Sequence, residues 1–418
     1  MLETIRNAWK IADLRKRLLF TLGMFLVFRV GAHITVPGLD VVAVQELFSQ
    51  GLFGLVDLIS GGALRQLSVF ALSIGPYVTA SIIIQLLTAV IPSWEEMVKE
   101  GEEGRKKQQQ YIRYATVILA YIQGFATVWG LRNTGAVINP SVWNILLLAL
   151  NFAAGTAVLM WIGELITEKG IGNGISLIIF ANIVSQVPTG MASIYGGVRA
   201  GVLAIWVVLI LGVLALLVVG AVVVIQEGQR RIPVQYAKRV VGRKMYGGQS
   251  THIPLRVNQA GVIPVIFSSS LLMFPQLLAR FVNAGWAQKL AEWLSFGAPL
   301  HTVLYIGLII MFAYFYTFMQ FNPRDVSDNL RQYGGFIPGL RPGRPTTEYL
   351  TRVVNRLTLV GAIFLCLIVF LPLIVSTTVG YNISLGGTAL LIIVGVALET
   401  MKQVEAQMAI RHYGGFMR

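Results

Sequence analysis

Runs of about twenty apolar residues recur along the chain, separated by shorter stretches rich in polar residues, glycine or proline. As an α-helix, a run of about twenty residues spans the roughly 30 Å hydrocarbon core of a bilayer. Ten such windows predict an all-α membrane protein with ten transmembrane helices. The predicted spans are Leu18 to Val36, Val69 to Ile91, Tyr111 to Leu131, Val142 to Ile166, Ile171 to Val187, Ala200 to Ile225, Ala260 to Leu278, Val303 to Phe321, Leu357 to Thr377 and Ile383 to Leu398.

The second of these spans has a defective beginning. Glycines and an arginine interrupt the apolar pattern between Asp57 and Leu67, and Gly75 with Pro76 interrupts it again. Backbone that leaves helical geometry at membrane depth finds no water in lipid, so it has to face protein or a water-filled cavity. The stretch from Asp57 to Ile91 therefore predicts an internal cavity.

The ten spans divide into two halves of five, residues 1–190 and 191–418. Because five is odd, the second half enters the membrane in the opposite direction. Inverted repeats bind or conduct at the interface between their halves, and broken spans at corresponding positions indicate that interface. Glycine and proline are frequent in membrane helices generally, so this pairing is a hypothesis. In the first pair, span two is broken by Gly75-Pro76 and span seven by Pro264 and Pro275. In the second pair, span five begins with Gly170, Gly172 and Gly174, and span ten begins with Gly386-Gly387.

The distribution of basic residues predicts the topology. The chain has 33 basic and 19 acidic residues, a net charge of +14, and the bases are concentrated in the connectors after spans two, six and eight. The positive-inside rule places these connectors and both termini in the cytosol. The two long cytosolic loops are residues 226–257 and 322–356. No cleavable signal pattern is expected, because the first apolar run leads into Arg29 and His33.

The chemistry of the chain argues against an enzyme and against a coupled solute transporter. The single cysteine, Cys366, allows no intramolecular disulfide, and the four histidines are scattered. No HExxH or Walker motif occurs, so we expect no catalysis, no cofactor and no metal. A coupled transporter would carry ionisable groups in mid-membrane, whereas Glu164 and Glu399 lie near predicted cytosolic ends.

Aliphatic side chains in the broken spans offer a different possibility. Residues four apart share one helix face, and faces that converge between the halves would form an apolar constriction that dewets when empty. The same spacing also occurs where a membrane helix meets lipid or a neighbouring helix, so spacing alone leaves both interpretations open. The residues concerned are Ile74, Val78, Ile179, Ile183, Ile266 and Ile392.

The loop at residues 226–257 predicts a projecting basic hairpin. The segments IPVQYA and HIPLRV alternate as strands do, on either side of a predicted turn at Tyr246-Gly247-Gly248. Such a hairpin either enforces topology and contacts anionic lipid, or docks an acidic or polyanionic partner through its arginines.

Several stretches are specific enough to indicate a family. They are SGGALRQLSVFALSIGPY (60–77), SIIIQLLTAVIP, GELITEKGIGNGISLIIFANIV (163–184), the segment 236–275, GGFIPGLRPGRPT (334–346) and LTLVGAIFL (357–365). The chain resembles the SecY family, the central subunits of the bacterial protein-conducting channel, through all ten spans. The resemblance implies an hourglass pore in the bacterial cytoplasmic membrane between two inverted five-helix halves. The resemblance also implies that a short plug helix closes this pore and that the pore opens sideways to lipid between spans two and seven.

The resemblance also implies roles for individual residues. The six aliphatic residues above correspond to the pore ring, with Val78 where the family often has isoleucine. The plug corresponds to Ser60, Gly61, Gly62, Ala63, Leu64, Arg65, Gln66 and Leu67. The lateral gate includes Gln85, Gln123 and Asn258, and partners dock at Arg239, Arg243, Lys244, Arg256 and Arg341.

The implied function is passage of unfolded polypeptides across the membrane and sideways release of transmembrane segments into lipid. The implied partners are the SecE and SecG subunits, the SecA motor ATPase, the ribosome with its RNA, a polypeptide carrying a signal sequence, and membrane lipids. Two alternative functions are also considered. A secondary solute transporter would need a coupling carboxylate in mid-membrane, and a ribosome-docking receptor would show no conductance.

Overall fold

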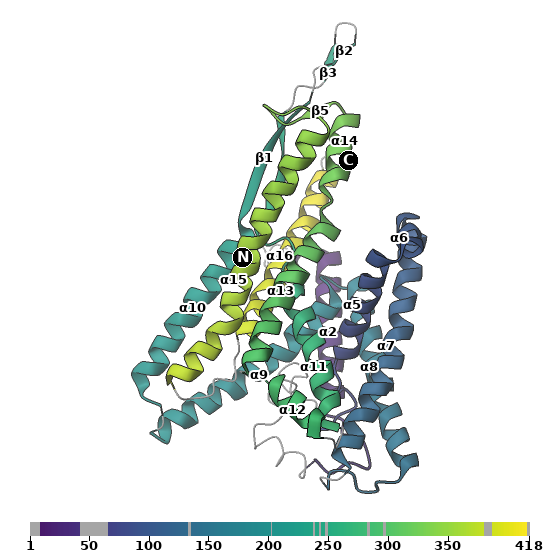
Figure 1. The fold of residues 1–418 in the computed structure, drawn as a ribbon, viewed down its shortest axis with the longest axis vertical. Helices are drawn as coiled ribbons and strands as arrows, with labels where there is room; N and C mark the ends of the chain where they lie inside the picture. Colours follow the sequence, from purple (N-terminus) through teal and green to yellow (C-terminus); the bar gives the residue numbers. More distant parts are fainter. Residues whose placement is uncertain are drawn as a thin grey trace.

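The computed structural model is a bundle of long helices with a small β-sheet that projects beyond one end (Figure 1). It describes residues 9–41, 66–132, 135–201, 203–236, 239–241, 244–246, 250–281, 285–295, 298–379 and 387–415. The long helices are α2 (Ala12–Gly31), α5 (Gly75–Val90), α7 (Glu102–Leu131), α8 (Val142–Lys169), α9 (Gly174–Arg199), α10 (Ile205–Glu227), α11 (Ile263–Phe281), α13 (Pro299–Gln320), α15 (Arg344–Val379) and α16 (Gly387–Gly415). The shorter helices are α6 (Pro92–Lys99), α12 (Gly285–Trp293) and α14 (Pro323–Gln332).

Each predicted span overlaps one of these long helices. Among the described residues, six helices are long and apolar enough to cross a membrane, and a seventh span forms if α5 and α6 are counted together across their 100° bend. On α10 only Val218 and Val222 are buried, while large apolar side chains such as Leu209 and Leu216 are exposed. Such a surface suits lipid and not water. The chain is a multi-pass membrane protein whose spans are helical, and the full set of ten spans stays a prediction.

Several helices continue beyond the apolar window that predicted them. The helix α15 begins at Arg344 and not at Leu357, so the end of the predicted loop 322–356 is helical. Likewise α7 begins at Glu102, and α16 continues to Gly415. These polar extensions carry ion pairs between successive turns, Lys106 to Glu102 at 3.3 Å and Arg344 to Glu348 at 3.1 Å, which support an exposed helix.

The second predicted span is helical only from Gly75. Residues 66–74 form turns, and Leu67 and Ser73 have φ values of 46° and 52°, a left-handed conformation uncommon outside glycine. The backbone of this turn segment is satisfied inside the protein, since Val36 N–H donates to the Leu67 carbonyl at 3.0 Å and Val69 N–H donates to the Ile34 carbonyl at 2.9 Å. The interruption predicted from the sequence is therefore an ordered, hydrogen-bonded segment, called here the turn segment 66–74.

Two glycines allow the turn segment to lie close to its neighbours. A Cβ atom at Gly155 of α8 would overlap the carbonyl oxygen of Val69, and one at Gly31 of α2 would overlap the ring of Phe70. Because the Val69 atom belongs to the backbone, no side-chain movement could relieve the overlap at Gly155. The helix α5 then begins directly after the turn segment, with Pro76 in its first turn, where proline is well tolerated.

The predicted hairpin is present, but one of its three predicted turn residues, Tyr246, lies in a strand. Strand β1 (Gln229–Tyr236) pairs antiparallel with β4 (Ser250–Arg256), with Gln229 opposite Arg256. Beyond them, β2 (Arg239–Val241) and β3 (Lys244–Tyr246) form a second ladder. Tyr246 lies in β3 opposite Arg239 and so does not form the turn. Residues 247–249 lie outside the described residues.

The two long loops that are predicted to be cytosolic form one structural unit. The short strand β5 (Gly335–Phe336) adds to the free edge of β1, which gives the sheet order β4-β1-β5. One face of this sheet packs against α14 and the first turns of α15 in an apolar cluster. Its buried members are Ile232, Val234, Leu255, Leu330, Ile337, Leu350, Val353 and Val354.

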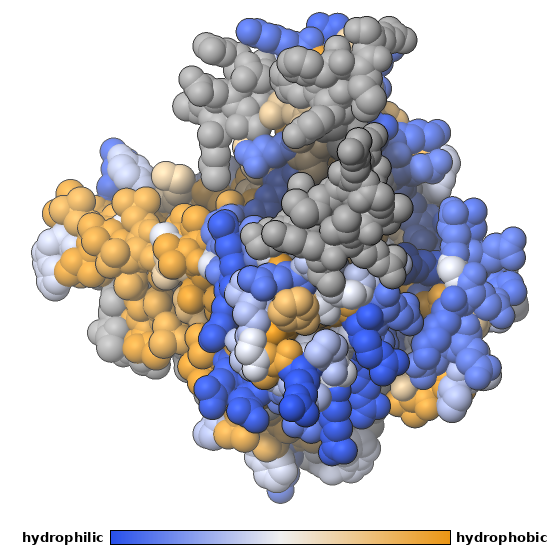
Figure 2. Space-filling model, turned by 90° about the horizontal axis from the view of Figure 1, so that it is seen from above, coloured by the Kyte–Doolittle hydropathy of each residue, from blue (hydrophilic) through white to orange (hydrophobic). Residues whose placement is uncertain are grey.

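One end of the bundle carries the sheet together with α6 and α14 (Figure 1). These elements contain or adjoin the basic connectors after spans two, six and eight, which are predicted to lie on one side of the membrane. Seen from this end, hydrophilic residues cover much of the molecule and an apolar region extends to one side (Figure 2). The predicted basic connectors therefore share one end of the molecule.

Candidate functional site

The six aliphatic residues predicted to form a constriction belong to one apolar cluster. Five of them are buried, with 2% to 8% of their surface exposed, and Ile266 is partly buried against the cluster. Four helices contribute, with Ile74 directly before α5: Ile74 and Val78, then Ile179 and Ile183 on α9, Ile266 on α11 and Ile392 on α16. All six therefore belong to the same large apolar cluster, and their convergence on one constriction and their role as a seal stay predictions.

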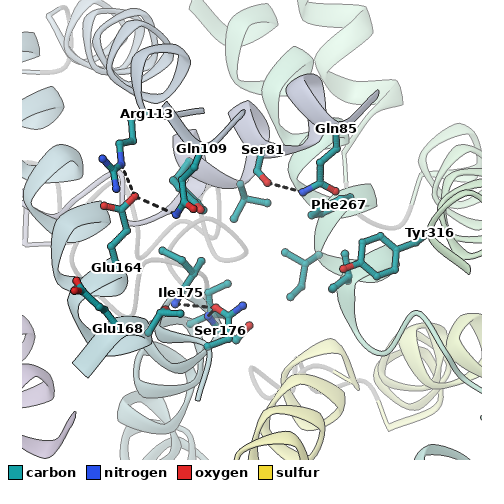
Figure 3. A pocket seen from close by; sticks show the side chains of 17 residues that line it. Ser81, Gln85, Gln109, Arg113, Glu164, Glu168, Ile175, Ser176, Phe267 and Tyr316 are labelled. Carbon is teal, nitrogen blue, oxygen red and sulfur yellow. Dashed lines mark hydrogen bonds and ion pairs between the residues drawn. The ribbon is translucent and has the colours of Figure 1, made fainter. Parts of the chain in front are cut away.

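A cavity of about 460 Å³ lies beside this cluster, between α5, α7, α8, α9, α11 and α13 (Figure 3). Val78, Ile179 and Ile266 line the cavity and also belong to the cluster. Ile74 and Ile183 lie one helical turn further along their elements, away from the cavity's polar residues. Val78, Ile179 and Ile266 therefore form an apolar floor of the cavity, which the cluster extends beneath.

The glycine-rich turn before α9 positions the side chains that this helix contributes. A Cβ atom at Gly174 would overlap the carbonyl oxygen of Gly163, so glycine is required for α9 to begin this close to α8. Gly172 has a φ of 89°, which favours glycine. The side chain of Asn173 then caps α9, because its Oδ1 accepts hydrogen bonds from the backbone N–H groups of Ile175 and Ser176 at 3.1 and 3.2 Å.

A buried hydrogen bond joins the turn segment to α9 at the level of the cluster. Asn182 is fully buried, and its Nδ2 donates to Ser73 Oγ at 3.0 Å. Asn182 directly precedes Ile183, and Ser73 directly precedes Ile74. This bond therefore fixes two of the cluster's side chains relative to each other. A polar pair in apolar surroundings is costly to break, because each group would lose its partner without gaining water.

Charged residues lie on one wall of the cavity. Arg113 Nε of α7 contacts Glu164 Oε1 of α8 at 2.8 Å, and Gln109 donates to the same oxygen at 3.5 Å (Figure 3). Glu168 lies one turn further along α8 and also lines the cavity. The opposite side presents Phe267 and Tyr316.

Of the three predicted lateral-gate residues, one lines the cavity. Gln85 lines the cavity and donates to Ser81 Oγ at 2.9 Å. Asn258 is buried just before α11, where its Nδ2 donates to the carbonyl of Gly261 at 3.0 Å. Neither Asn258 nor Gln123 is among the cavity's lining residues. Their part in a gate stays a prediction.

The predicted plug and docking residues lie partly outside the described residues. This applies to Ser60, Gly61, Gly62, Ala63, Leu64, Arg65 and Arg243. Gln66 and Leu67, predicted to end a plug helix, form a turn instead, and Leu67 is fully buried. Arg239 and Lys244 belong to strands β2 and β3, and only their backbone is described. Arg256 and Arg341 are exposed at the sheet-bearing end.

Sequence reasoning missed two residues of the site. Asn182 is a polar residue within an apolar window, and such residues in membrane helices often bond to a neighbouring element. Arg113 lies at the start of the third predicted span, and only the packing of α7 on α8 places it beside Glu164. Within the described residues, no group of three or more His, Cys, Asp or Glu side chains could hold a metal ion.

Comparison with known proteins gives a consistent result. The SecY family model matches residues 68–401. Proteins named protein translocase subunit SecY are similar over the whole chain: that of Streptomyces scabiei is 49% identical over 440 residues, with all of both chains covered. That of Thermotoga maritima is 44% identical over 432 residues, covering 100% of this chain and 98% of the relative.

Solved structures share the fold at low sequence identity. One described as "The structure of a protein conducting channel" has a TM-score of 0.66 at 20% identity and covers 94% of this chain and 92% of its own. Another, Sec61 in the canine ribosome-channel complex from the endoplasmic reticulum, has a TM-score of 0.63 at 19% identity with the same coverage. At these identities the likeness shows the fold alone.

The hydrogen bond between Asn182 and Ser73 leads to a prediction on stability. We expect Asn182→Leu to lower the stability of the purified protein by about 1–3 kcal/mol, because Ser73 loses a buried partner. Asn151→Leu is the matched control, since Asn151 is exposed on α8 and bonds only within its own helix, to the Leu147 carbonyl at 3.1 Å. Thermal unfolding in detergent measures both. Equal unfolding temperatures for the two variants would contradict the role given to this bond.

Proposed function

The chain belongs to the SecY family, and from this membership we propose how its residues form a path for polypeptides. It is the channel subunit of a protein translocase. This membership favours polypeptide conduction over a solute transporter or a docking receptor that does not conduct. The observation that carries the residue-level proposal is that three of the six aliphatic residues line the floor of one cavity, while all six belong to the apolar cluster beside it.

We propose that these six residues are a pore ring between two inverted halves, residues 1–190 and 191–418. An aliphatic ring offers a passing chain no strong hydrogen bonds, so an extended polypeptide of any sequence can slide through it. When the ring is empty, its apolar walls disfavour water and therefore hold back ions. The burial of Ile74 and Ile183 together with the bond between Asn182 and Ser73 supports a ring that is held closed.

The proposed plug, residues 60–67, leads directly into this ring. Its last residue, Leu67, is fully buried against the N-terminal half and is followed by the turn segment. Because the turn segment also ends at Ile74, a movement of the plug would be transmitted to the ring over few residues. This connection supports a plug that stops the pore when shut and loosens the ring when displaced.

The proposed lateral gate lies between α5 and α11. These two helices contact each other, and both line the cavity, through Val78 and Ser81 on α5 and Ile263 and Ile266 on α11. If they separate, an apolar segment in the cavity reaches lipid sideways. Partition of about twenty apolar residues into lipid is favourable and would complete its release. Gln85, Gln123 and Asn258 are the polar residues proposed for this gate.

The proposed setting is the cytoplasmic membrane of a bacterium, with ten spans and both termini in the cytosol. The shared position of the basic connectors at the sheet-bearing end supports this orientation. The proposed subunits are SecE and SecG, and membrane lipids surround the bundle. The energy that drives the polypeptide through the channel is proposed to come from translation, from SecA or from the membrane potential.

The sheet-bearing end is the proposed docking surface for SecA and for the ribosome with its RNA. The loop that carries Arg341 is held to α14 by a hydrogen bond, since Ser327 Oγ donates to the Gly343 carbonyl at 3.0 Å, and Gly339 and Gly343 supply its turns with φ values of 83° and 100°. The Arg341 carbonyl in turn accepts a hydrogen bond from Thr346 Oγ1 at 2.9 Å. An exposed arginine on a fixed loop suits phosphate and carboxylate groups, whose geometry its planar fork matches.

The ring is tested by making it polar. We expect Ile266→Asn and Ile392→Asn each to raise ion leak in reconstituted vesicles at least about tenfold, because an amide that hydrates the constriction lowers the barrier by more than about 1.4 kcal/mol. Ile138→Asn is the control, since Ile138 is 69% exposed in a connection away from the cluster. If conductance is the same for all three variants, these residues do not form the seal.

The docking surface is tested by charge reversal. We expect Arg341→Glu to weaken binding of SecA or of ribosomes by roughly tenfold, about the loss of one hydrogen bond to a charged group. Arg199→Glu is the control, because Arg199 ends α9 at the opposite end of the bundle. Equilibrium binding to vesicles that contain each variant gives the two affinities. The proposal fails if Arg341→Glu binds both partners as tightly as Arg199→Glu does.

A further inference from the structure

The cavity has one charged wall and one apolar wall, and the two walls match the two parts of an amphipathic ligand. Figure 3 shows Arg113, Glu164 and Glu168 on the side of α7 and α8, with Phe267 and Tyr316 across the cavity. The apolar side continues through Ile263 and Ile266 of α11 to the floor. A segment that is apolar along its length and charged at one end could contact both walls at once.

The charged wall carries a net negative charge. Its charged residues are one base, Arg113, and two carboxylates, Glu164 and Glu168, and these are the charged side chains among the residues that line the cavity. Arg113 and Glu164 neutralise each other at 2.8 Å. Glu168 is exposed and forms no ion pair within the part of the chain that the structure describes. One carboxylate is therefore left to attract a cation.

This negative charge contrasts with the sheet at the same end of the molecule, which carries Arg230, Arg231 and Arg256. The bases of α6 and the first turns of α7 are mostly paired with carboxylates, Lys99 with Glu95, Lys106 with Glu102 and Lys107 with Glu100. A cationic segment that approaches this end is repelled by the sheet arginines and attracted by the cavity wall. Attraction over a few ångströms is stronger inside a partly enclosed cavity than in open water.

We propose that Glu168, with Glu164 one turn before it, selects polypeptides by the basic residues that flank their apolar segment. The proposal rests on the proposed function, passage of polypeptides through this cavity. Residues four apart share one helix face, so both carboxylates face the same side of α8. The apolar part would lie along α5 and α11, while its basic flank stays at the cytosolic end of α8. That arrangement retains the positive flank on the cytosolic side, in agreement with the positive-inside rule.

Glu168→Gln is the most direct test, because it removes the unpaired charge without breaking the ion pair of Glu164. The assay is transport into vesicles that contain the assembled translocase, with two reporters that share one apolar segment and differ only in a basic or neutral flank. We expect wild-type protein to prefer the basic reporter and Glu168→Gln to reduce that preference roughly two- to fivefold, the range of an exposed ion pair. Glu168→Asp should keep most of the preference, and Glu168→Lys should abolish or invert it.

The control is Glu103→Gln, which removes an exposed carboxylate from the first turn of α7, outside the cavity. It should leave the preference at the wild-type value. The proposal is overturned if Glu168→Gln and Glu168→Lys transport both reporters in the wild-type ratio. Failure of the proposed function gives a different result, since wild-type protein would then transport neither reporter.

Discussion

The fold depends on one constraint: backbone that leaves helical geometry inside a membrane protein has to find its hydrogen-bond partners within the protein. The turn segment 66–74 meets this constraint through backbone bonds to Ile34 and Val36 and through close packing on Gly155. Because the segment is anchored there, Ile74 and the start of α5 have a fixed position. The bond from Ser73 to Asn182 then connects that position to α9 and Ile183. The proposed seal is thus supported by polar contacts directly beside it.

Apolar and charged surfaces are separated along the length of the bundle. The floor of the cavity is aliphatic, its walls become polar toward the ends of α5 and α8, and the sheet beyond them is basic. The pairing of β5 with β1 joins the two long loops into one body, and α15 continues from that body into the helical bundle. The sheet is therefore connected through α15 to α13, one of the helices that line the cavity.

The apolar windows were enough to predict the long helices, because a bilayer requires about twenty apolar residues for each span. They did not predict where α7, α15 and α16 begin or end, since helical hydrogen bonding continues past the apolar residues wherever the polar sequence permits it. The spacing of Ile74 and Val78 pointed to a shared face, but only helix packing shows which faces meet. The pair of Arg113 and Glu164 joins residues 51 apart in the sequence, and nothing local indicates such a contact.

The central claim is that a polypeptide crosses the centre of the aliphatic ring. The most direct measurement is crosslinking of a stalled translocation intermediate to single cysteines at Val78 and Ile183, in a Cys366→Ala background that removes the chain's one native cysteine. A cysteine at Leu359, which is 45% exposed on α15, reports contact at the outside of the bundle. The account predicts crosslinks from both ring positions and none from Leu359. Crosslinks from Leu359 without any from Val78 and Ile183 would contradict it.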